Sequence, residues 1–361
     1  MLGMLAACSD DDKPADERRT YELQLSMGAT SFNEAGQTRA LPVGFEPYNQ
    51  TLQPINQIQA YFGYVCKDEN NNNVITYEPA VFTHTTSSEG TATTHAWKSR
   101  LALKTPSSDP KTYYLYGYMP REDVASATFS TLGSDKTYAD GAILTLKGLT
   151  TVTSGDVCII VGVKGYDASI PDMSYRLRAF DYYPDTDGKN LFLLVDHIYA
   201  ALQVRMRLDE SYAQLRQIKL KSITLTPGEA IPSTINATVT LTKDAEPEVS
   251  FSTPEEVNAV PQPASLHGVS GTRLLSEWNI FQACLYPTTE SAPTYTMTTI
   301  YDVYDRKNNL IREDQTAQNT ITLPNALGAG QRHTVNITVK PTYLYSLSDD
   351  DLDDPTFSIT P

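Results

Sequence analysis

The chain has 361 residues and a formal net charge of −15 at pH 7. This acidity argues against nucleic acid or an anionic membrane surface as a partner, because both would repel the chain. The length allows two domains of ordinary size, each with its own hydrophobic core. The 22 tyrosines, against 10 phenylalanines, favour strands that have one solvent-facing side.

The first residues carry a pattern that is typical of a lipid-attachment site. Small residues precede a cysteine in Leu5–Cys8, as a signal peptidase requires, and the Cys8 thiol can then carry the lipid. An acidic run, Ser9–Asp12, follows directly, as in the tethers of lipoproteins that are exposed outside an outer membrane. We therefore predict a lipoprotein leader and acidic tether over residues 1–19. No basic region precedes Cys8, which indicates that the start of this sequence is truncated or internal.

The other cysteines lie far apart, without a CxxC pair or a metal-type spacing. If Cys8 carries a lipid, an odd number remains, which argues against a disulfide framework but leaves one bridge open. We expect Cys66, Cys158 and Cys284 to be buried free thiols. After residue 8, no apolar run approaches the roughly 20 residues that a membrane helix needs.

A removable strand is predicted over residues 20–28. Apolar and polar residues alternate there, which is the period of a strand with one buried face. Beyond it, Arg39 and Ala40 stand in a Gly, Gln and Thr setting that is open to a trypsin-like protease. We expect the cut after Arg39, because a cut at Arg18 or Arg19 would leave the strand attached. The apolar positions that would fill the groove are Tyr21, Leu23, Leu25 and Met27.

Short alternating segments continue along the whole chain, and turn signals separate them. A turn-rich segment at 181–190 indicates a domain edge, and Pro227-Gly228 indicates a turn. Such spacing predicts an all-β chain of two antiparallel β-sandwich domains in tandem, over 20–187 and 188–361. We expect further strands near 58–66, 74–84, 94–103, 112–119, 142–149, 156–163, 202–208, 218–225, 235–242, 247–252, 278–285, 295–304, 319–323 and 333–340, with one helical turn in 209–216.

The sequence contains no motif that predicts an enzyme, a cofactor site or a metal site. The five histidines lack a paired spacing; His84 and His95 could face each other across a hairpin, but ordinary histidines explain them better. His197 opens an apolar strand and is expected to make a structural hydrogen bond. The tyrosines of segment 113–118 could stack on sugars, although a tyrosine-rich pleated surface is the commoner interpretation.

Together these features resemble the fimbrillin-like lipoproteins, which build protease-activated type V pili in Bacteroidales-type bacteria. The resemblance rests on Leu5–Cys8 with its acidic run, on the Arg39-Ala40 junction, on Tyr113–Pro120, on the strand that begins at His197, and on Gly328–Val339. It implies two transthyretin-like β-sandwich domains, export as an outer-membrane lipoprotein, and cleavage after an arginine by a surface trypsin-like protease. It also implies that other pilus subunits are the partners, in a homo- or heteropolymer.

The resemblance further implies that a terminal strand of the next subunit replaces the removed one. Four buried side chains on that strand would contribute about 6–12 kcal/mol, at about 1.5–3 each. A partner strand with the same alternation restores both the burial and the ladder hydrogen bonds. The candidate donor tail is 341–361, and its apolar residues are Tyr343, Tyr345, Leu347, Phe357 and Ile359.

The acidic stretch Asp349–Asp354 departs from this pattern, because a buried donor strand tolerates aspartates badly. Either the donor lies before Asp349, or the subunit is a tip or an anchor without a full donor. The alternative function is a surface lipoprotein that binds a glycan or another host ligand, keeps its first strand and never polymerises.

Overall fold

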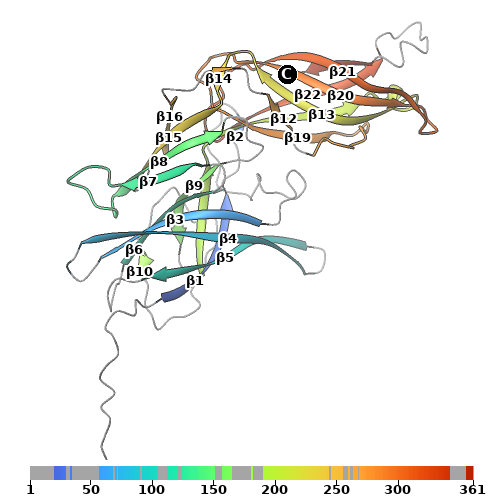
Figure 1. Ribbon diagram of the computed structural model, residues 1–361. Helices are drawn as coiled ribbons and strands as arrows, with labels where there is room; N and C mark the ends of the chain where they lie inside the picture. The colour runs from blue at the N-terminus through green and yellow to red at the C-terminus, as the bar shows by residue number, and fades with distance from the viewer. Residues whose placement is uncertain are drawn as a thin grey trace, which may run out of the picture.

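The computed structural model describes residues 20–29, 33–34, 57–67, 70, 72–89, 92–104, 112–119, 124–150, 157–164, 180–181, 190–243, 245–254, 259–260, 263–266, 268–341 and 355–360. These residues form β-strands and a single four-residue helix, so the prediction of an all-β chain is confirmed (Figure 1). No helix in these ranges is long and apolar enough to cross a bilayer.

The first half contains β1 (Thr20–Ala29), β2 (Asn33–Glu34), β3 (Gln57–Lys67), β4 (Asn73–Glu89), β5 (Ala92–Lys104), β6 (Thr112–Met119), β7 (Ser126–Ser130), β8 (Gly141–Thr150), β9 (Cys158–Lys164) and β10 (Phe180–Asp181). The second half contains β11 (Asn190–His197), β12 (Ala200–Leu208), α1 (Glu210–Ala213), β13 (Gln217–Pro227), β14 (Ile231–Pro232), β15 (Thr234–Thr242), β16 (Glu248–Ser252), β17 (Ala259–Val260), β18 (Ala264–Ser265), β19 (Asn279–Leu285), β20 (Thr294–Tyr304), β21 (Leu310–Thr322), β22 (Gln331–Pro341) and β23 (Pro355–Thr360).

One large sheet in the N-terminal part closes on itself. Its strand order is β10-β6-β3-β4-β5-β1-β11-β9, and β9 pairs in turn with β6. Because side chains alternate across each strand, every second residue points into the enclosed core. That core contains Phe62, Phe82 and Trp97, each at most 2% exposed. Because the sheet closes, each strand of the ring pairs with a neighbour on both sides over at least part of its length.

A four-stranded sheet, β16-β15-β8-β7, packs against the outside of this closed sheet. Its central ladder joins β8 to β15, although about ninety residues separate the two strands in the sequence. Gly141 begins this ladder with a φ of 140°, and a Cβ there would lie 2.0 Å from the Leu241 carbonyl oxygen, so glycine is required. The ladder crosses the expected domain boundary at 187/188. That boundary lies outside the described residues and stays a prediction.

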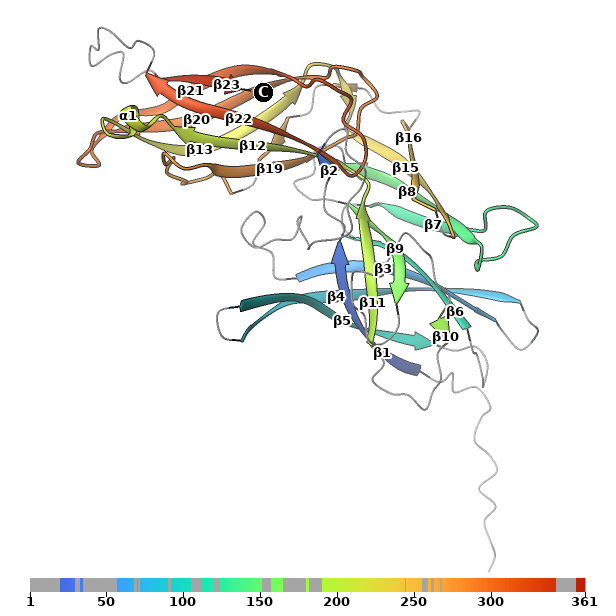
Figure 2. The ribbon, with the colours of Figure 1, turned by 180° about the vertical axis from the view of Figure 1, so that it is seen from behind.

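The C-terminal part is a sandwich of two sheets around a second core. One sheet has the order β19-β12-β22-β2, with β23 also paired to β22, and the other has the order β18-β13-β20-β21. On β12, Leu202, Val204 and Met206 point into the core, and Gln203 and Arg205 point outward, as the alternation predicts. Figures 1 and 2 show the β7, β8, β15 and β16 sheet between this sandwich and the closed sheet.

Candidate functional site

Strand β1 fills a slot in the closed sheet. It pairs antiparallel with β5, from Thr20 opposite Lys104 to Met27 opposite Trp97. On its other side it pairs parallel with β11, from Gln24 opposite Asn190 to Ala29 opposite Val195. Figure 2 shows β1 and β11 side by side and pointing the same way. Taking β1 away would therefore open the ring and leave two unpaired edges.

Leu25 shows how the strand fills the slot. It is 1% exposed and lies in the enclosed core. Its two register partners are Ser99 on β5 and Leu191 on β11. Tyr21, Leu23 and Met27 also lie on β1, but their side chains are outside the described part of the structure. The walls of the slot are the buried residues Trp97, Leu101, Leu191 and Leu193.

Strand β2 ties the segment after β1 to the C-terminal sandwich. Asn33 and Glu34 pair parallel with Gln331 and Arg332 at the start of β22. Both β1 and β2 precede Arg39, so a cut there would break the covalent link between these two strands and the rest of the chain. The lipidation residue Cys8 and the junction residues Arg39 and Ala40 lie outside the described residues, and their roles stay predictions.

The C-terminal strand β23 packs on its own sandwich. It pairs antiparallel with β22, with Phe357 opposite Val339 and Ile359 opposite Ile337. The Phe357 ring lies 5.3 Å from the Tyr301 ring, and its carbonyl oxygen accepts a 3.0 Å hydrogen bond from Asn319 Nδ2. A donor segment that contains Phe357 and Ile359 would first have to leave these contacts. The other candidate donor residues, Tyr343, Tyr345 and Leu347, are not described.

The tyrosines of β6 belong to the cores rather than to a sugar-binding surface. Tyr113, Tyr116 and Tyr118 are at most 3% exposed, and only Tyr114 is half-buried. The Tyr116 hydroxyl donates to the Tyr138 carbonyl oxygen at 2.5 Å, and burial raises its pKa well above the ordinary value. The alternative that these rings stack on sugars and the preferred interpretation of a tyrosine-rich surface are therefore both wrong, because β6 is covered on both faces.

His197 makes a buried contact, as predicted. Its Nδ1 lies 3.4 Å from Cys158 Sγ across the β9–β11 ladder, and both residues are at most 1% exposed. The Asp196 carboxylate accepts a 2.9 Å hydrogen bond from the His197 backbone N–H. Cys158 and Cys284 are buried free thiols, as expected. The burial of this Cys–His pair leaves no room for a substrate, so we assign it a structural role.

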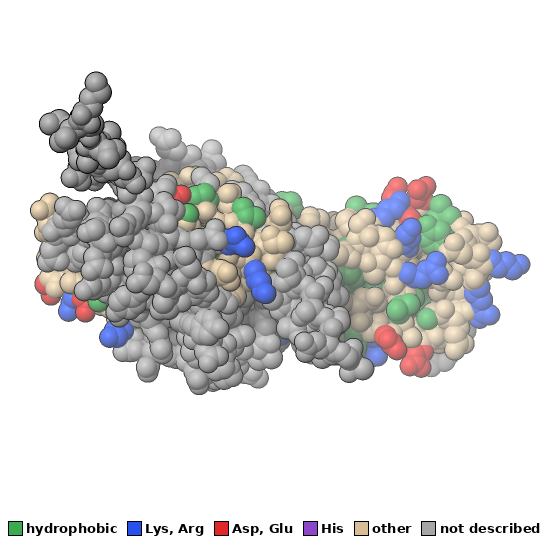
Figure 3. Space-filling view, turned by 90° about the horizontal axis from the view of Figure 1, so that it is seen from below, with side chains coloured by type: hydrophobic (Ala, Val, Ile, Leu, Met, Phe, Trp, Pro, Cys, Tyr) green, Lys and Arg blue, Asp and Glu red, His purple; other side chains and the backbone are tan. Residues whose placement is uncertain are grey.

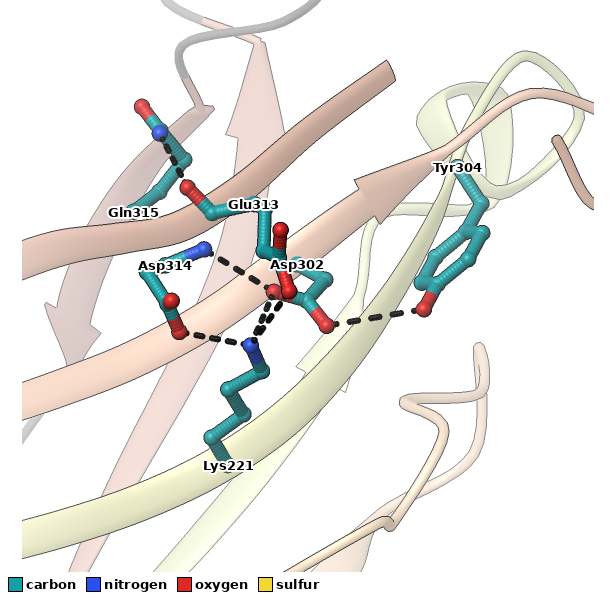
Figure 4. A network of polar contacts seen from close by, with 6 residues as sticks. All are labelled: Lys221, Asp302, Tyr304, Glu313, Asp314 and Gln315. Atoms are coloured by element: carbon teal, nitrogen blue, oxygen red, sulfur yellow. Dashed lines mark hydrogen bonds and ion pairs between the residues drawn. The ribbon is translucent and has the colours of Figure 1, made fainter. Parts of the chain in front are cut away.

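On the face that Figure 3 shows, lysines and arginines lie interspersed with aspartates and glutamates among the described residues. Besides Asp196, Asp302 is a second buried carboxylate, and it lies on the sheet β18-β13-β20-β21. The side chain of Asp302 is 7% exposed, and its Oδ1 lies 3.0 Å from Lys221 Nζ and accepts a 2.9 Å hydrogen bond from the Asp314 backbone N–H (Figure 4). Lys221 Nζ also lies 2.5 Å from Asp314 Oδ1. Both neighbouring ladders have a register shift at this level.

These contacts shift two pKa values in opposite directions. Hydrogen bonds to Asp314 and Asp302 raise the pKa of Lys221. Burial raises the pKa of Asp302, but the Asp314 N–H and the Lys221 ammonium lower it more, so it lies below 3.8. The Lys221 ammonium therefore offsets part of the negative charge of Asp302, Asp314 and Glu313. Among the described residues, no group of three or more His, Cys, Asp or Glu side chains could hold a metal ion. The cluster fixes the irregular edge strand β21, and such irregularity protects an edge from pairing with other chains.

We expect Asp302→Asn to lower the free energy of unfolding by about 1–3 kcal/mol at neutral pH, because Lys221 and the Asp314 N–H lose their charged acceptor. The pKa of Asp302 is lowered on folding, so its contribution is present above about pH 3.8 and is lost as the pH falls below that value. Urea titrations from pH 7 down to about pH 2.5 should therefore show a steeper acid loss in the wild type than in Asp302→Asn. If wild type and Asp302→Asn lost stability in parallel as the pH falls, Asp302 would not be the group responsible. Asp135→Asn, at an exposed position, is the control.

A pocket lies where the C-terminal sandwich meets the four-stranded sheet. Its volume is about 600 Å³, and its walls come from β14, β16, the β19–β20 connection and the turn before β22. The aromatic residues Phe251, Tyr286 and Tyr295 line it together with the carboxylates of Glu229 and Glu290. The sequence analysis did not identify this pocket, because its residues are dispersed over a hundred positions and carry no motif.

Comparison with known proteins gives matches of fold only. No protein-family model matches the sequence, and no curated protein matches it. Among solved structures, the chain is similar to a fimbrial protein from Bacteroides vulgatus, with 12% identity, a TM-score of 0.39, and coverage of 93% of this chain and 98% of that one. A fimbrial assembly protein from Parabacteroides distasonis has 10% identity, a TM-score of 0.34, and coverage of 94% and 99%. The fimbrial anchor protein Mfa2 from Porphyromonas gingivalis has 8% identity, a TM-score of 0.26, and coverage of 94% and 95%.

Proposed function

We propose that this chain is a structural, non-enzymatic subunit of a cell-surface pilus that contributes to adhesion. The observation that carries the proposal is the position of β1, which pairs on both sides yet lies at the start of the described chain. A terminal strand can leave without rupture of the rest of the fold, whereas an internal strand cannot. The slot that it vacates is lined by large apolar side chains and bordered by two open edges, which favours the uptake of another strand.

The steps around this exchange follow the sequence. The chain is exported as a lipoprotein and held at the outer membrane, on the cell surface, through a lipid on Cys8. A surface trypsin-like protease then cuts after Arg39, and β1 and β2 leave with the lipidated segment. A terminal strand of another subunit fills the slot. The domain division at 187/188 belongs to this proposal as well.

The donor in this scheme is the tail 341–361. In the uncut subunit β23 covers the edge of β22, which keeps Phe357 away from the solvent until a slot is open. Because β2 and β23 both pair with β22, loss of β2 exposes the part of the β22 edge next to β23. If β23 stays in place in the assembled form, the donor lies before Asp349, or the subunit is a tip or an anchor.

Arg39→Ala tests the cleavage step. We expect trypsin to leave β1 attached in this variant and the protein to stay monomeric, whereas the cut wild-type protein assembles. Size-exclusion chromatography, with mass spectrometry of the products, measures both results. Arg39→Lys is the matched control, since trypsin also cuts after lysine, and it should assemble like the wild type. A cut wild-type protein that keeps β1 and remains a monomer would overturn the proposal.

A surface lipoprotein that binds a ligand and never polymerises is the second candidate. The pocket lined by Tyr286 and Glu290 favours it, because pockets of a few hundred Å³ with aromatic walls and few polar groups are typical of ligand sites. The same trypsin experiment separates the two functions, because only the pilus subunit needs the loss of β1.

A further inference from the structure

The charged residues that line the pocket at the junction are all acidic. Two glutamates, Glu229 and Glu290, border it, and no lysine, arginine or histidine is among its lining residues. Neither carboxylate forms an ion pair within the described part of the chain. The pocket is therefore complementary to a positive charge. The full lining is Pro227, Glu229, Ala230, Ile231, Pro232, Val249, Ser250, Phe251, Ala264, Leu285, Tyr286, Pro287, Thr288, Thr289, Glu290, Pro293, Thr294, Tyr295, Gly328 and Ala329.

Aromatic rings lie beside these carboxylates. The ring of Tyr286 packs edge-on against that of Phe251, with centroids 5.4 Å apart and an angle of 77° between the planes. Tyr295 is 6% exposed, and burial together with the Glu290 carboxylate raises its pKa to about 12. The Tyr295 hydroxyl therefore stays neutral, and Glu290 lines the same pocket as this ring. An organic cation gains both from a carboxylate and from the faces of such rings.

The walls of the pocket are held in place by backbone hydrogen bonds. The N–H of Gly228 donates to the Thr294 carbonyl oxygen at 2.8 Å, and that of Thr288 donates to the Leu327 carbonyl oxygen at 2.9 Å. The backbone N–H of Glu290 donates to Thr288 Oγ1 at 3.1 Å. Proline at four lining positions restricts the walls further. The site is thus formed before a ligand arrives, which lowers the entropic cost of binding.

A strand edge borders the pocket. Val249, Ser250 and Phe251 of β16 line it, and β16 is the last strand of its sheet. Among the described strands, only β15 pairs with β16, so its other edge presents backbone N–H and C=O groups. An extended polypeptide can pair with such an edge while one of its side chains enters a neighbouring pocket. This feature favours a peptide over a small amine or an amino sugar.

We propose that this pocket binds a lysine or arginine side chain from an extended segment of a partner polypeptide. Glu290 provides the counter-charge, and Tyr286 and Tyr295 contact the side-chain stem and its charged head. Glu229, which is exposed, adds charge at the rim. The proposal is independent of the exchange of β1, because none of the lining residues belongs to the closed sheet.

The test uses the intact, uncut chain and end-blocked five-residue peptides with threonine and valine around a central lysine, arginine or norleucine. Isothermal titration calorimetry should show binding of the lysine or arginine peptide at least tenfold tighter than of the norleucine peptide. Glu290→Gln, which keeps the shape of the side chain, should remove this preference. Glu248→Gln is the matched control, because Glu248 is exposed on β16, next to the lining residue Val249, but does not itself line the pocket.

Three outcomes would overturn the proposal: equal binding of the norleucine peptide, unchanged preference in Glu290→Gln, or glucosamine binding as tightly as the lysine peptide. Thermal unfolding of both variants shows whether they are folded. Peptide binding to the uncut chain does not depend on assembly after trypsin. A negative binding result therefore leaves the pilus proposal intact, and a failure to assemble leaves the peptide-binding proposal intact.

Discussion

A disulfide between β1 and β5 will keep the cut subunit monomeric, and reduction of that disulfide will start assembly. Gln24 and Arg100 lie opposite each other in the β1–β5 ladder, and both are exposed, so Gln24→Cys/Arg100→Cys leaves the core unchanged. Opposite residues of antiparallel strands have Cα atoms about 4.5–5.5 Å apart, which suits a disulfide. After a cut at Arg39 the oxidised strand cannot leave its slot, and we expect assembly to slow by at least about tenfold.

Light scattering of the trypsin-treated variant, before and after a reductant is added, measures this effect. The control is Ser126→Cys/Lys147→Cys, which joins β7 to β8 at two exposed, opposed positions and leaves β1 free. This control should assemble in both redox states. If the oxidised Gln24→Cys/Arg100→Cys protein assembled as fast as the control, β1 would not be the strand that is exchanged.

Leu25→Ala will destabilise the uncut protein by about 2–5 kcal/mol, because it removes a fully buried side chain and leaves a cavity in the closed sheet. The same substitution should not change the stability of the cut protein from which β1 has been removed, since the residue is no longer there. Urea unfolding of both forms measures the two effects. Gln24→Ala, at an exposed position of the same strand, should change either form by less than about 0.5 kcal/mol.

A Leu25→Ala effect of equal size in both forms would show that β1 remains bound after the cut. That result would favour the ligand-binding surface protein. A difference between the forms would show that β1 stabilises only the precursor, as a strand that protects the slot until assembly should.

Alternation of apolar and polar residues was enough to locate most strands. Segments such as 202–208 and 235–242 have one buried face, so the alternation in their sequence predicts the strand directly. Strand β21 begins nine residues before the predicted strand at 319, because most of its side chains are exposed or half-exposed and the alternation is lost. An edge strand of a sandwich needs no strong apolar face where solvent reaches both sides.

Long-range pairing could not be predicted from the same patterns. Nothing in β8 or β15 indicates that they pair with each other rather than with their neighbours in the sequence. For the same reason the contact of Cys158 with His197 and the junction pocket emerged only from the structure. The alternation did place Leu25 on a buried face, but it could not show that the strand closes a ring.

The path of the chain between its two halves has a mechanical consequence. The chain enters the C-terminal sandwich between β11 and β12, returns to the four-stranded sheet through β14 and β15, and enters the sandwich again after β16. These three covalent crossings, which remain after β1 and β2 are lost, and a shared ladder resist bending and torsion better than a single linker would. Under tension such a subunit transmits force as one stiff rod, so compliance in a fibre built from it must come from the joints between subunits.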